Sequence, residues 1–437
     1  MVLACGPIQW IATTCTMPRL SLRIAGPIFV GLMAFPLIAP QSVQASPDAL
    51  RTRLAQLSAE TNTLEVLLES LATGELPGEP PIALDETSRA RVIQELAAEE
   101  RAALLSRFKR LVAEESPANW RSAALEVLGR MAGPRELSLT FDLVGDEPVP
   151  DAALREGLHD VLVRLHYHDP GIALELQSAF LNASGVIQDV CLRALDVNPS
   201  REALDLFVRC LGAGGSSLDV ALLARLGLGW EQRPVWIEET ALSRVRDLST
   251  SSTESVAREA ISALGHARDT EDAERWIALL DGASPSQART AHWALRQVTG
   301  LELGTRPDPW RTWLAASRKW QTERKDTALQ ELRGSNRTLV VRALRDISNQ
   351  KLDRRELASA VSELLIDSDE QVAATAIASL RALDSKAAVL PLLEALEAGD
   401  EAWLETCHAA LLDLTGLVCE PSAGAWREAL GLEDTQP

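Results

Sequence analysis

Residues 254–314 and 370–430 are two copies of one segment, and this duplication constrains the fold more than any other feature of the chain. The copies align without a gap at a spacing of 116 residues and share 17 of 61 residues. The shared residues are mostly Val, Ala, Ile, Leu, Thr, Gly and Trp, which build cores and end helices. A chain that repeats such residues is expected to fold as repeated structural units.

Apolar residues recur at intervals of three and four within each copy, which predicts amphipathic helices with one buried face. The predicted helices cover 254–264 and 370–380, then 272–280 and 387–397, and then begin again near Gln287 and Trp403. Equivalent leucines lie 31 residues apart, from Leu264 to Leu295 and from Leu380 to Leu411. The predicted unit is therefore a helical hairpin of about 31 residues.

The same pattern returns outside the duplication, in segments centred on leucine. NWRSAALEVLGR, VIQDVCLRALDV and LDVALLARLGLG place it at Leu128, Leu195 and Leu226, with weaker instances at Leu165 and Leu344. Hairpins of this size cannot bury their apolar faces alone, so they stack on their neighbours. The expected fold is all-α, an α-solenoid of stacked helical hairpins.

The segment SDEQVAATAIASL (368–380) carries an acidic residue followed by Val-Ala, then spaced Ala and a closing Leu. In these residues the chain resembles the HEAT-repeat family, specifically its short bacterial form. The resemblance covers roughly 117–430 and implies a HEAT-like superhelix. It is specific for fold and not for function.

The chain divides by pattern into several predicted parts. These are a signal peptide (1–45), an N-terminal helix (46–72), a Pro/Gly linker (73–87), HEAT-like repeats (88–253), copy 1 (254–314), a helical spacer (315–369), copy 2 (370–430) and a tail (431–437). Within the spacer, the charged stretch from Arg311 to about Arg333 is expected to be a solvated helix.

Both copies contain Thr-Gly-Leu followed by Trp-Arg. Gly300 and Gly416 are expected to end a helix in the left-handed conformation. Asp308 is expected to cap the next helix and Pro309 to begin it, which places Trp310 and Trp313 one turn apart on a buried side. Trp426 repeats Trp310 in copy 2. We interpret these tryptophans as core residues, and a Trp-lined ligand groove is the alternative.

The first 45 residues contain two Arg and no acidic residue, an apolar run from Ile24 to Ala39, and small residues up to Ala45. This order is typical of a secretory signal peptide cleaved after Ala45. The apolar run is shorter than the roughly 20 residues of a spanning helix, although a membrane anchor is the alternative. Translation could start at Met1 or Met17. The protein is therefore expected to be exported to the periplasm or cell envelope, with no stable membrane insertion after cleavage.

Without residues 1–45 the chain has 41 basic and 62 acidic residues, a net charge of −21. Such a surface repels phosphate backbones, so nucleic acid is not an expected ligand, and it favours basic protein partners. Four cysteines remain. Cys191 with Cys210 and Cys407 with Cys419 could form disulfides in an exported protein, or all four could be buried free thiols.

Four groups of residues resemble chemical sites. His159, His166 and His168 could bind a metal, but the last two fit a helix C-terminus before Asp169. His292 and His408 are equivalent across the duplication, which favours a structural role for both.

Asp367, Asp369 and Glu370 lack the Gly and Glu of a calcium loop and are expected to cap a helix. The Gly-rich stretch LGAGGSS (211–217) has no Lys after it and is expected to be a loop.

The sequence thus predicts no catalytic, cofactor-binding or metal-binding residue and leaves the binding residues undetermined. The expected function is a non-enzymatic scaffold that binds a protein partner. One alternative is a subunit or regulator of an enzyme, because short HEAT-like repeats also occur in bilin lyase subunits. The other alternative is a structural component of the envelope.

Overall fold

The computed structural model of the chain describes residues 43–44, 47–57, 63–77, 81–98, 101–114, 116–131, 133–145, 149–282, 284–366, 369–398 and 401–432. The predicted signal peptide lies outside these ranges except for Val43 and Gln44, which form the short strand β1. Asp367 also lies outside them.

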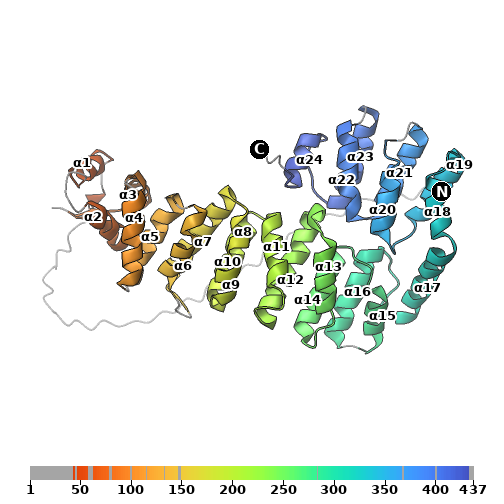
Figure 1. Cartoon of the computed structure of the whole chain (residues 1–437), viewed down its shortest axis with the longest axis horizontal. Coiled ribbons are helices and arrows are strands. Elements are labelled where there is room, and N and C mark those ends of the chain that lie inside the picture. Colours follow the sequence, from red (N-terminus) through yellow and green to blue (C-terminus); the bar gives the residue numbers. More distant parts are fainter. Residues whose placement is uncertain are drawn as a thin grey trace, which may run out of the picture.

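The described residues form helical hairpins stacked side by side along the chain, which confirms the predicted all-α solenoid (Figure 1). One row of helices contains α5 (Ala118–Met131), α7 (Ala152–His168), α10 (Gly185–Val197), α12 (Ser216–Gln232), α14 (Glu254–His266) and α16 (Pro285–Thr299). The other row contains α4 (Arg101–Ala113), α6 (Leu137–Val144), α8 (Ile172–Glu175), α9 (Gln177–Asn182), α11 (Arg201–Cys210), α13 (Glu239–Leu248), α15 (Ala273–Gly282) and α17 (Pro307–Glu323). Short 3-10 helices occur at η1 (Pro134–Glu136) and η2 (Pro234–Trp236).

The N-terminal part differs from the prediction of one helix over 46–72. It contains two helices, α1 (Pro47–Leu57) and α2 (Thr63–Thr73). Helix α1 contacts α3 (Glu86–Ala98), and α2 contacts both α3 and α5. The predicted linker contains strands β2 (Glu75–Leu76) and β3 (Ile82–Ala83), which pair antiparallel, while β1 pairs parallel with β3. The solenoid packing therefore includes α2, which precedes this segment.

The expectation of a solvated helix over Arg311 to Arg333 was wrong. The segment is divided between α17 and α18 (Lys325–Leu332), and Ala328 and Leu332 are buried. They begin a second hydrophobic core, which runs from Ala328 to Leu430, whereas the first runs from Leu50 to Leu314 and includes Leu352. A charged segment can bury one apolar stripe, so overall charge alone was a poor guide to exposure here.

The second core is built from the remaining helices. They are α18, α19 (Arg337–Ser348), α20 (Arg354–Ser362), α21 (Glu370–Leu383), η3 (Lys386–Ala388), α22 (Val389–Ala398), α23 (Glu401–Thr415) and α24 (Ala423–Ala429). The predicted spacer therefore contributes α18, α19 and α20 as packed helices in the same manner as the duplicated copies.

The solenoid turns back on itself at α17 and α18, so that α20 to α24 return beside α13 to α16 (Figure 1). Contacts of η2 with η3 and α22 join the returning part to the middle of the chain. Arg233 donates from Nη1 to the carbonyl oxygen of Ala429 at 2.5 Å, across 196 residues. Gly431 has φ +65° and lies so close to Trp236 that a Cβ would approach the indole at 2.8 Å. Residues from η2 onward thus form a closed arrangement of hairpins.

The predicted helix ends after Thr-Gly are confirmed. Gly300 (φ 70°) and Gly416 (φ 71°) are left-handed, and each donates to the carbonyl oxygen four residues earlier at 2.8 Å. The predicted start of the next helix in copy 1 was wrong, because α17 begins at Pro307 and Arg306 precedes it without a side-chain cap. Proline fits the first turn of a helix, and Pro307 comes before Pro309 in the chain.

Candidate functional site: a charged cavity between the two copies

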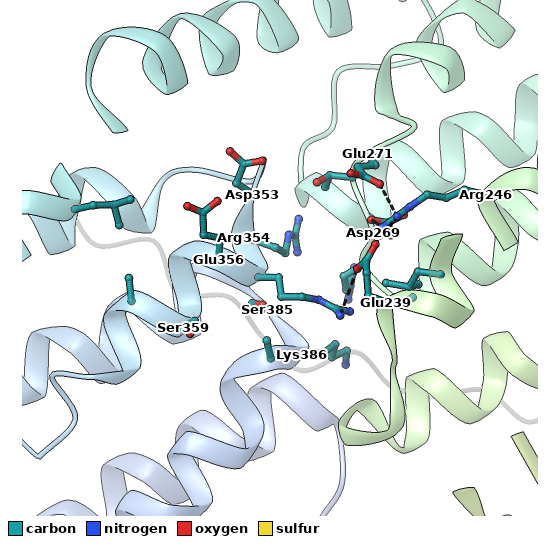
Figure 2. Close-up of a pocket in the computed structure, with 18 of the residues that line it drawn as sticks. Glu239, Arg246, Asp269, Glu271, Asp353, Arg354, Glu356, Ser359, Ser385 and Lys386 are labelled. Carbon is teal, nitrogen blue, oxygen red and sulfur yellow. Dashed lines mark hydrogen bonds and ion pairs between the residues drawn. The ribbon is translucent and has the colours of Figure 1, made fainter. Parts of the chain in front are cut away.

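A cavity of about 570 Å³ lies where the returning helices face the middle of the chain. Its lining comes from α13, the loop 267–271, α18, α20 and the segment 385–387. In Figure 2 the side chains of Glu239, Arg246, Asp269 and Glu271 come from one part of the chain, and those of α20 and η3 face them. The cavity therefore exists only because the solenoid closes.

The duplication extends further toward the N-terminus than residue 254. At the same spacing of 116 residues, α13 corresponds to α20, and Ser243, Val245 and Leu248 have identical counterparts at 359, 361 and 364. The buried residues also coincide: Ala241, Leu242 and Val245 in α13 match Leu357, Ala358 and Val361 in α20. Helices α13 and α20 are thus equivalent, and the cavity is lined by equivalent segments of both copies.

Two pairs of equivalent residues contact each other across this closure. Arg268 corresponds to Asp384, and their Nε and Oδ2 atoms lie 3.5 Å apart. Glu239 corresponds to Arg355, and their Oε2 and Nη1 atoms lie 3.7 Å apart. Contacts between equivalent residues are what a local two-fold arrangement produces. Each pair joins opposite charges, so the two copies attract each other where they meet.

Arg268 and Asp384 also share an uncommon backbone conformation. Their φ angles are 58° and 52°, in the left-handed region that non-glycine residues rarely adopt. Each follows the first helix of its copy, so the duplicated turn has the same geometry with a basic side chain in one copy and an acidic one in the other. Asp353, before α20, also has a positive φ of 54°.

On the copy 1 side, Arg246 is held by three carboxylates. Its guanidinium lies 2.7 Å from Asp269, 2.6 Å from Glu239 and 2.5 Å from Glu271. Burial lowers the pKa of Arg246, but the hydrogen bonds and charges of Asp269 and Glu239 outweigh burial and raise the pKa overall. This side of the cavity therefore carries more negative than positive charge.

On the copy 2 side, the buried cations are Arg354 and Lys386, which are 4% and 9% exposed. Burial lowers the pKa of Arg354 to about 10 and also lowers the pKa of Lys386. The nearby acids Asp353 and Glu356 are bound by Lys325 Nζ at 2.7 and 2.6 Å. This side of the cavity therefore presents cations that its own acids do not neutralise.

The lining combines these charged side chains with hydroxyl groups. Its hydroxyl groups come from Thr270, Ser359 and Ser385, and no His or Cys occurs among the described lining residues. A serine nucleophile normally requires an adjacent base. In the part of the chain that the structure describes, no group of three His, Cys, Asp or Glu is arranged to hold a metal ion.

The three histidines near the start of the solenoid are not in this cavity. His166 is buried in α7, and its Nε2–H donates to the carbonyl oxygen of Asn198 at 2.8 Å. His159 Nδ1 instead lies 3.1 Å from Asp160. His166 and His168 lie in the last turn of α7, before Asp169, as predicted.

The equivalent histidines pack on the equivalent tryptophans. His292 contacts Trp310 at a ring-centroid distance of 6.3 Å, and His408 contacts Trp426 at 5.7 Å. Both tryptophans are fully buried, which confirms their interpretation as core residues. Trp313 contacts Trp310 edge-on but is only partly buried, so the prediction of a buried core residue holds only in part for Trp313.

The predicted cap and glycine loop have clear structural roles. Asp369 caps α21, and its Oδ1 accepts from the backbone N–H groups of Gln371 and Val372 at 3.0 and 3.3 Å. In the Gly-rich loop, Gly212 N–H donates to Asp219 Oδ1 at 2.7 Å, so a side chain of α12 occupies a donor that an anion would need.

The four cysteines among the described residues are free thiols. Cys191, Cys210 and Cys407 are buried, and burial raises their pKa values to about 12, 11 and 11. Cys419 is only partly buried, so the expectation of buried thiols holds for three of the four.

The cavity residues were not predicted from the sequence, although the sequence contains a signal for some of them. Extending the 116-residue alignment past its ungapped core pairs Glu239 with Arg355, and within that core Arg268 pairs with Asp384. Opposite charges at equivalent positions would have suggested that the two copies meet. The buried state of Arg354 and Lys386 had no local signal, because it arises from chain closure.

No family model matches the chain, and no curated protein sequence matches it. Among solved structures, the chain is similar to one from the Pds5-Scc1 complex, a structure described with implications for cohesin function. That similarity has 13% sequence identity and a TM-score of 0.26, over 91% of this chain and 75% of the other. It is also similar to an engineered protein, with 14% identity and a TM-score of 0.23, over 89% of this chain and 95% of the other. Similarity at this level bears on neither a partner nor an activity.

Proposed function

We propose that the chain is a non-enzymatic scaffold that binds a segment of a protein partner in the cavity between the two copies. The observation that carries this proposal is the lining itself. Five separate segments bring six basic and six acidic side chains around about 570 Å³, open to solvent, with hydroxyl groups but no His or Cys among the described lining residues. Such a surface offers many charged hydrogen bonds to a bound segment.

The proposed partner carries basic surface. The chain has a net charge of −19, and a strongly acidic surface steers oppositely charged proteins toward it. Binding is therefore expected to weaken as the salt concentration rises, because added ions screen the acidic field. A captured partner that is acidic and binds independently of salt would contradict this part of the proposal.

A matched pair of variants tests whether the cavity is the binding site. Ser359 and Ser243 occupy equivalent exposed positions on α20 and α13, but only Ser359 lines the cavity. Ser359→Trp should obstruct the cavity, whereas Ser243→Trp adds the same side chain outside it. Affinity capture with the purified chain, followed by mass spectrometry, should recover the same partner with wild type and S243W. That partner should be lost with S359W, and its retention by both variants would exclude the cavity.

We further propose that the protein works outside the cytoplasm, on the basis of the signal-like order of residues 1–45. In the native host, the mature N-terminus should then be Ser46, and recovery of an intact Met1 or Met17 start in the cytosol would contradict export. Among the helices described, none is long and apolar enough to cross a membrane.

The alternatives make different predictions. An envelope component with a purely structural role should self-associate without a partner. If the protein is an enzyme, the purified chain alone should turn over a substrate. Loss of that turnover on replacing His166 or His168 would contradict the scaffold proposal and favour the enzyme.

A further inference from the structure

Arg354 is a buried cation with an unused donor. Its guanidinium Nη1 donates to the carbonyl oxygen of Asp384 at 2.8 Å, and its Nε donates to that of Lys351 at 3.3 Å. Its Nη2 is buried and has no hydrogen-bond partner among the described residues. A buried charged group with an unsatisfied donor is costly unless a ligand or solvent supplies the acceptor.

Three other cations surround Arg354. Lys386 Nζ donates to the carbonyl oxygen of Leu414 at 2.6 Å, and Lys351 Nζ donates to that of Ala382. Arg268 is the third. Burial lowers the pKa values of Lys351 and Lys386, and the charges of Arg354 and Arg268 lower them further. The positive charges of Arg354 and Arg268 therefore act on both lysines, and that of Arg268 acts on Arg354.

One carboxylate lies within this group of cations. Asp384 is 33% exposed on its side chain, and its Oδ2 lies 3.5 Å from Arg268 and 3.8 Å from Arg354. These are ion-pair distances and exceed those of good hydrogen bonds. The single negative charge of Asp384 does not balance the four cations, so the group keeps an excess of positive charge.

The other acids that act on these cations are already bound elsewhere. Asp269 Oδ1 and Oδ2 accept from Arg246 at 3.0 and 2.7 Å, and Glu231 lies 3.0 Å from His266 Nδ1. Among the described residues, Asp269 and Glu231 therefore have cationic or histidine partners of their own besides these cations.

The geometry points to a carboxylate-binding centre formed by Arg354 and Lys386. Its ligand is an Asp or Glu side chain of the partner segment, which enters the cavity and accepts from Arg354 Nη2. This inference rests on the proposed function, because it names the anchor of the segment bound there. It adds that a partner of basic surface carries one acidic residue at its point of attachment.

The cavity favours a single carboxylate over a phosphate dianion. Glu239 and Glu271 line the same cavity, and their side chains are 61% and 68% exposed. Their field opposes a second negative charge on the ligand. A monoanion can still bind, because a charged hydrogen bond to a buried guanidinium is among the stronger polar contacts in proteins.

Short peptides test the centre without the natural partner. The probes are acetyl-Gly-Glu-Gly-amide, the matched acetyl-Gly-Gln-Gly-amide, and inorganic phosphate, each titrated into the purified full chain by calorimetry. We expect the Glu peptide to bind about tenfold or more tightly than the Gln peptide, the factor that one charged contact of about 1.4 kcal/mol provides. We expect phosphate to bind more weakly than the Glu peptide.

Two variants locate the binding. Arg354→Met and Lys386→Met should each weaken binding of the Glu peptide about tenfold and remove the preference over the Gln peptide. Arg155→Met is the control, because Arg155 is a partly buried arginine of α7 that also has an unpaired Nε and does not line this cavity. The helical circular dichroism signal and the melting temperature show whether each variant folds. If Arg354→Met does not fold, Lys386→Met serves as the test.

Each outcome supports or overturns the inference. Absence of Glu-peptide binding, or binding that both variants retain, would overturn it. If phosphate binds more tightly than the Glu peptide at the same residues, the proposal of a carboxylate ligand is wrong and the site binds an inorganic anion. Failure of partner capture through the cavity would contradict the proposed function alone, since peptide binding is measured independently of it.

Discussion

Trp310 and Trp426 show how a duplicated residue keeps its place while its polar contact changes. Both indoles are fully buried and pack against the equivalent histidine. Trp310 Nε1–H donates to the carbonyl oxygen of Gly304 at 2.7 Å, whereas Trp426 Nε1–H donates to His408 Nδ1 at 3.0 Å. Burial of the ring is therefore the inherited requirement, and each copy satisfies the N–H locally.

Replacing either tryptophan by alanine should cost about 3 to 5 kcal/mol of unfolding free energy, because a large buried side chain leaves a cavity. Denaturant unfolding of Trp310→Ala and Trp426→Ala measures this cost. Trp313→Ala is the control, since that ring is only partly buried and should cost less. Unchanged midpoints for both W310A and W426A would mean that the rings are exposed and would restore the alternative of a ligand groove.

His166 should make the protein less stable in mild acid. Burial lowers its pKa below the ordinary value, although the Asn198 carbonyl and the charges of Glu202 and Asp169 partly oppose this. The unfolded chain therefore takes up this proton at a higher pH than the folded chain does. Below about pH 6.5, the ordinary histidine pKa, stability falls as pH decreases toward the folded-state pKa.

His166→Gln isolates this effect, because glutamine can still donate to Asn198 and does not titrate. The loss of unfolding free energy between pH 7 and pH 5 should be smaller in the variant than in wild type. An identical loss in both proteins would show that His166 is not responsible.

Helix ends repeat more faithfully than helix starts. Thr299 and Thr415 each accept from the N–H of the leucine two residues later at 3.1 Å, and each hydroxyl donates to the carbonyl oxygen four residues earlier. The next helices begin differently, at Pro307 in copy 1 and after the cap Ser422 in copy 2. A left-handed stop needs glycine, whereas several residue types can begin a helix.

Gly300→Ala and Gly416→Ala should each lower the unfolding free energy by about 1 to 2 kcal/mol, the cost of a left-handed conformation for a residue with a Cβ. The effect should come from backbone strain alone, because an added Cβ would meet no atom within 4 Å at either position. Gly185→Ala is the matched control, since it has the same open space without a positive φ. Thermal and denaturant unfolding measure all three, and equal effects in all three would contradict the strain argument.

Where the two copies meet, equivalent positions carry opposite charges. Two identical copies related by a local two-fold would place like charges opposite each other at positions 268 and 384, and again at 239 and 355. In this chain each position carries the opposite charge from its equivalent, and the contacts are attractive. The opposite charges at these equivalent positions thus make both contacts part of the closure.

Exchanging the charges tests this at the level of the whole molecule. Arg268→Asp and Asp384→Arg should each destabilise the protein, because each places like charges opposite each other in a partly buried site. The double variant should lose about 1 kcal/mol less unfolding free energy than the two single variants lose together, because it restores a pair of opposite charges. Both positions already accommodate positive φ with either residue type. Unfolding titrations of all four proteins give the coupling, and strictly additive losses would contradict it.

The sequence by itself determined the elements and their order of stacking. Periodic apolar residues, Thr-Gly stops and the 116-residue duplication are local patterns, and they predict helical hairpins in a solenoid because each hairpin packs mainly on its neighbours. The structure bears this out from α5 to α24. The single helix over 46–72, the helix start at Pro309 and the solvated helix after Arg311 were predicted wrongly.

The tertiary structure alone decided that the solenoid closes and forms a charged cavity. Closure brings Arg233 to Ala429 and Arg268 to Asp384, pairs that are 196 and 116 residues apart. Curvature accumulates from small rotations between successive repeats, and no local pattern specifies their sum. The buried charges of Arg354 and Lys386 follow from that sum, so the candidate site became visible only when the two copies faced each other.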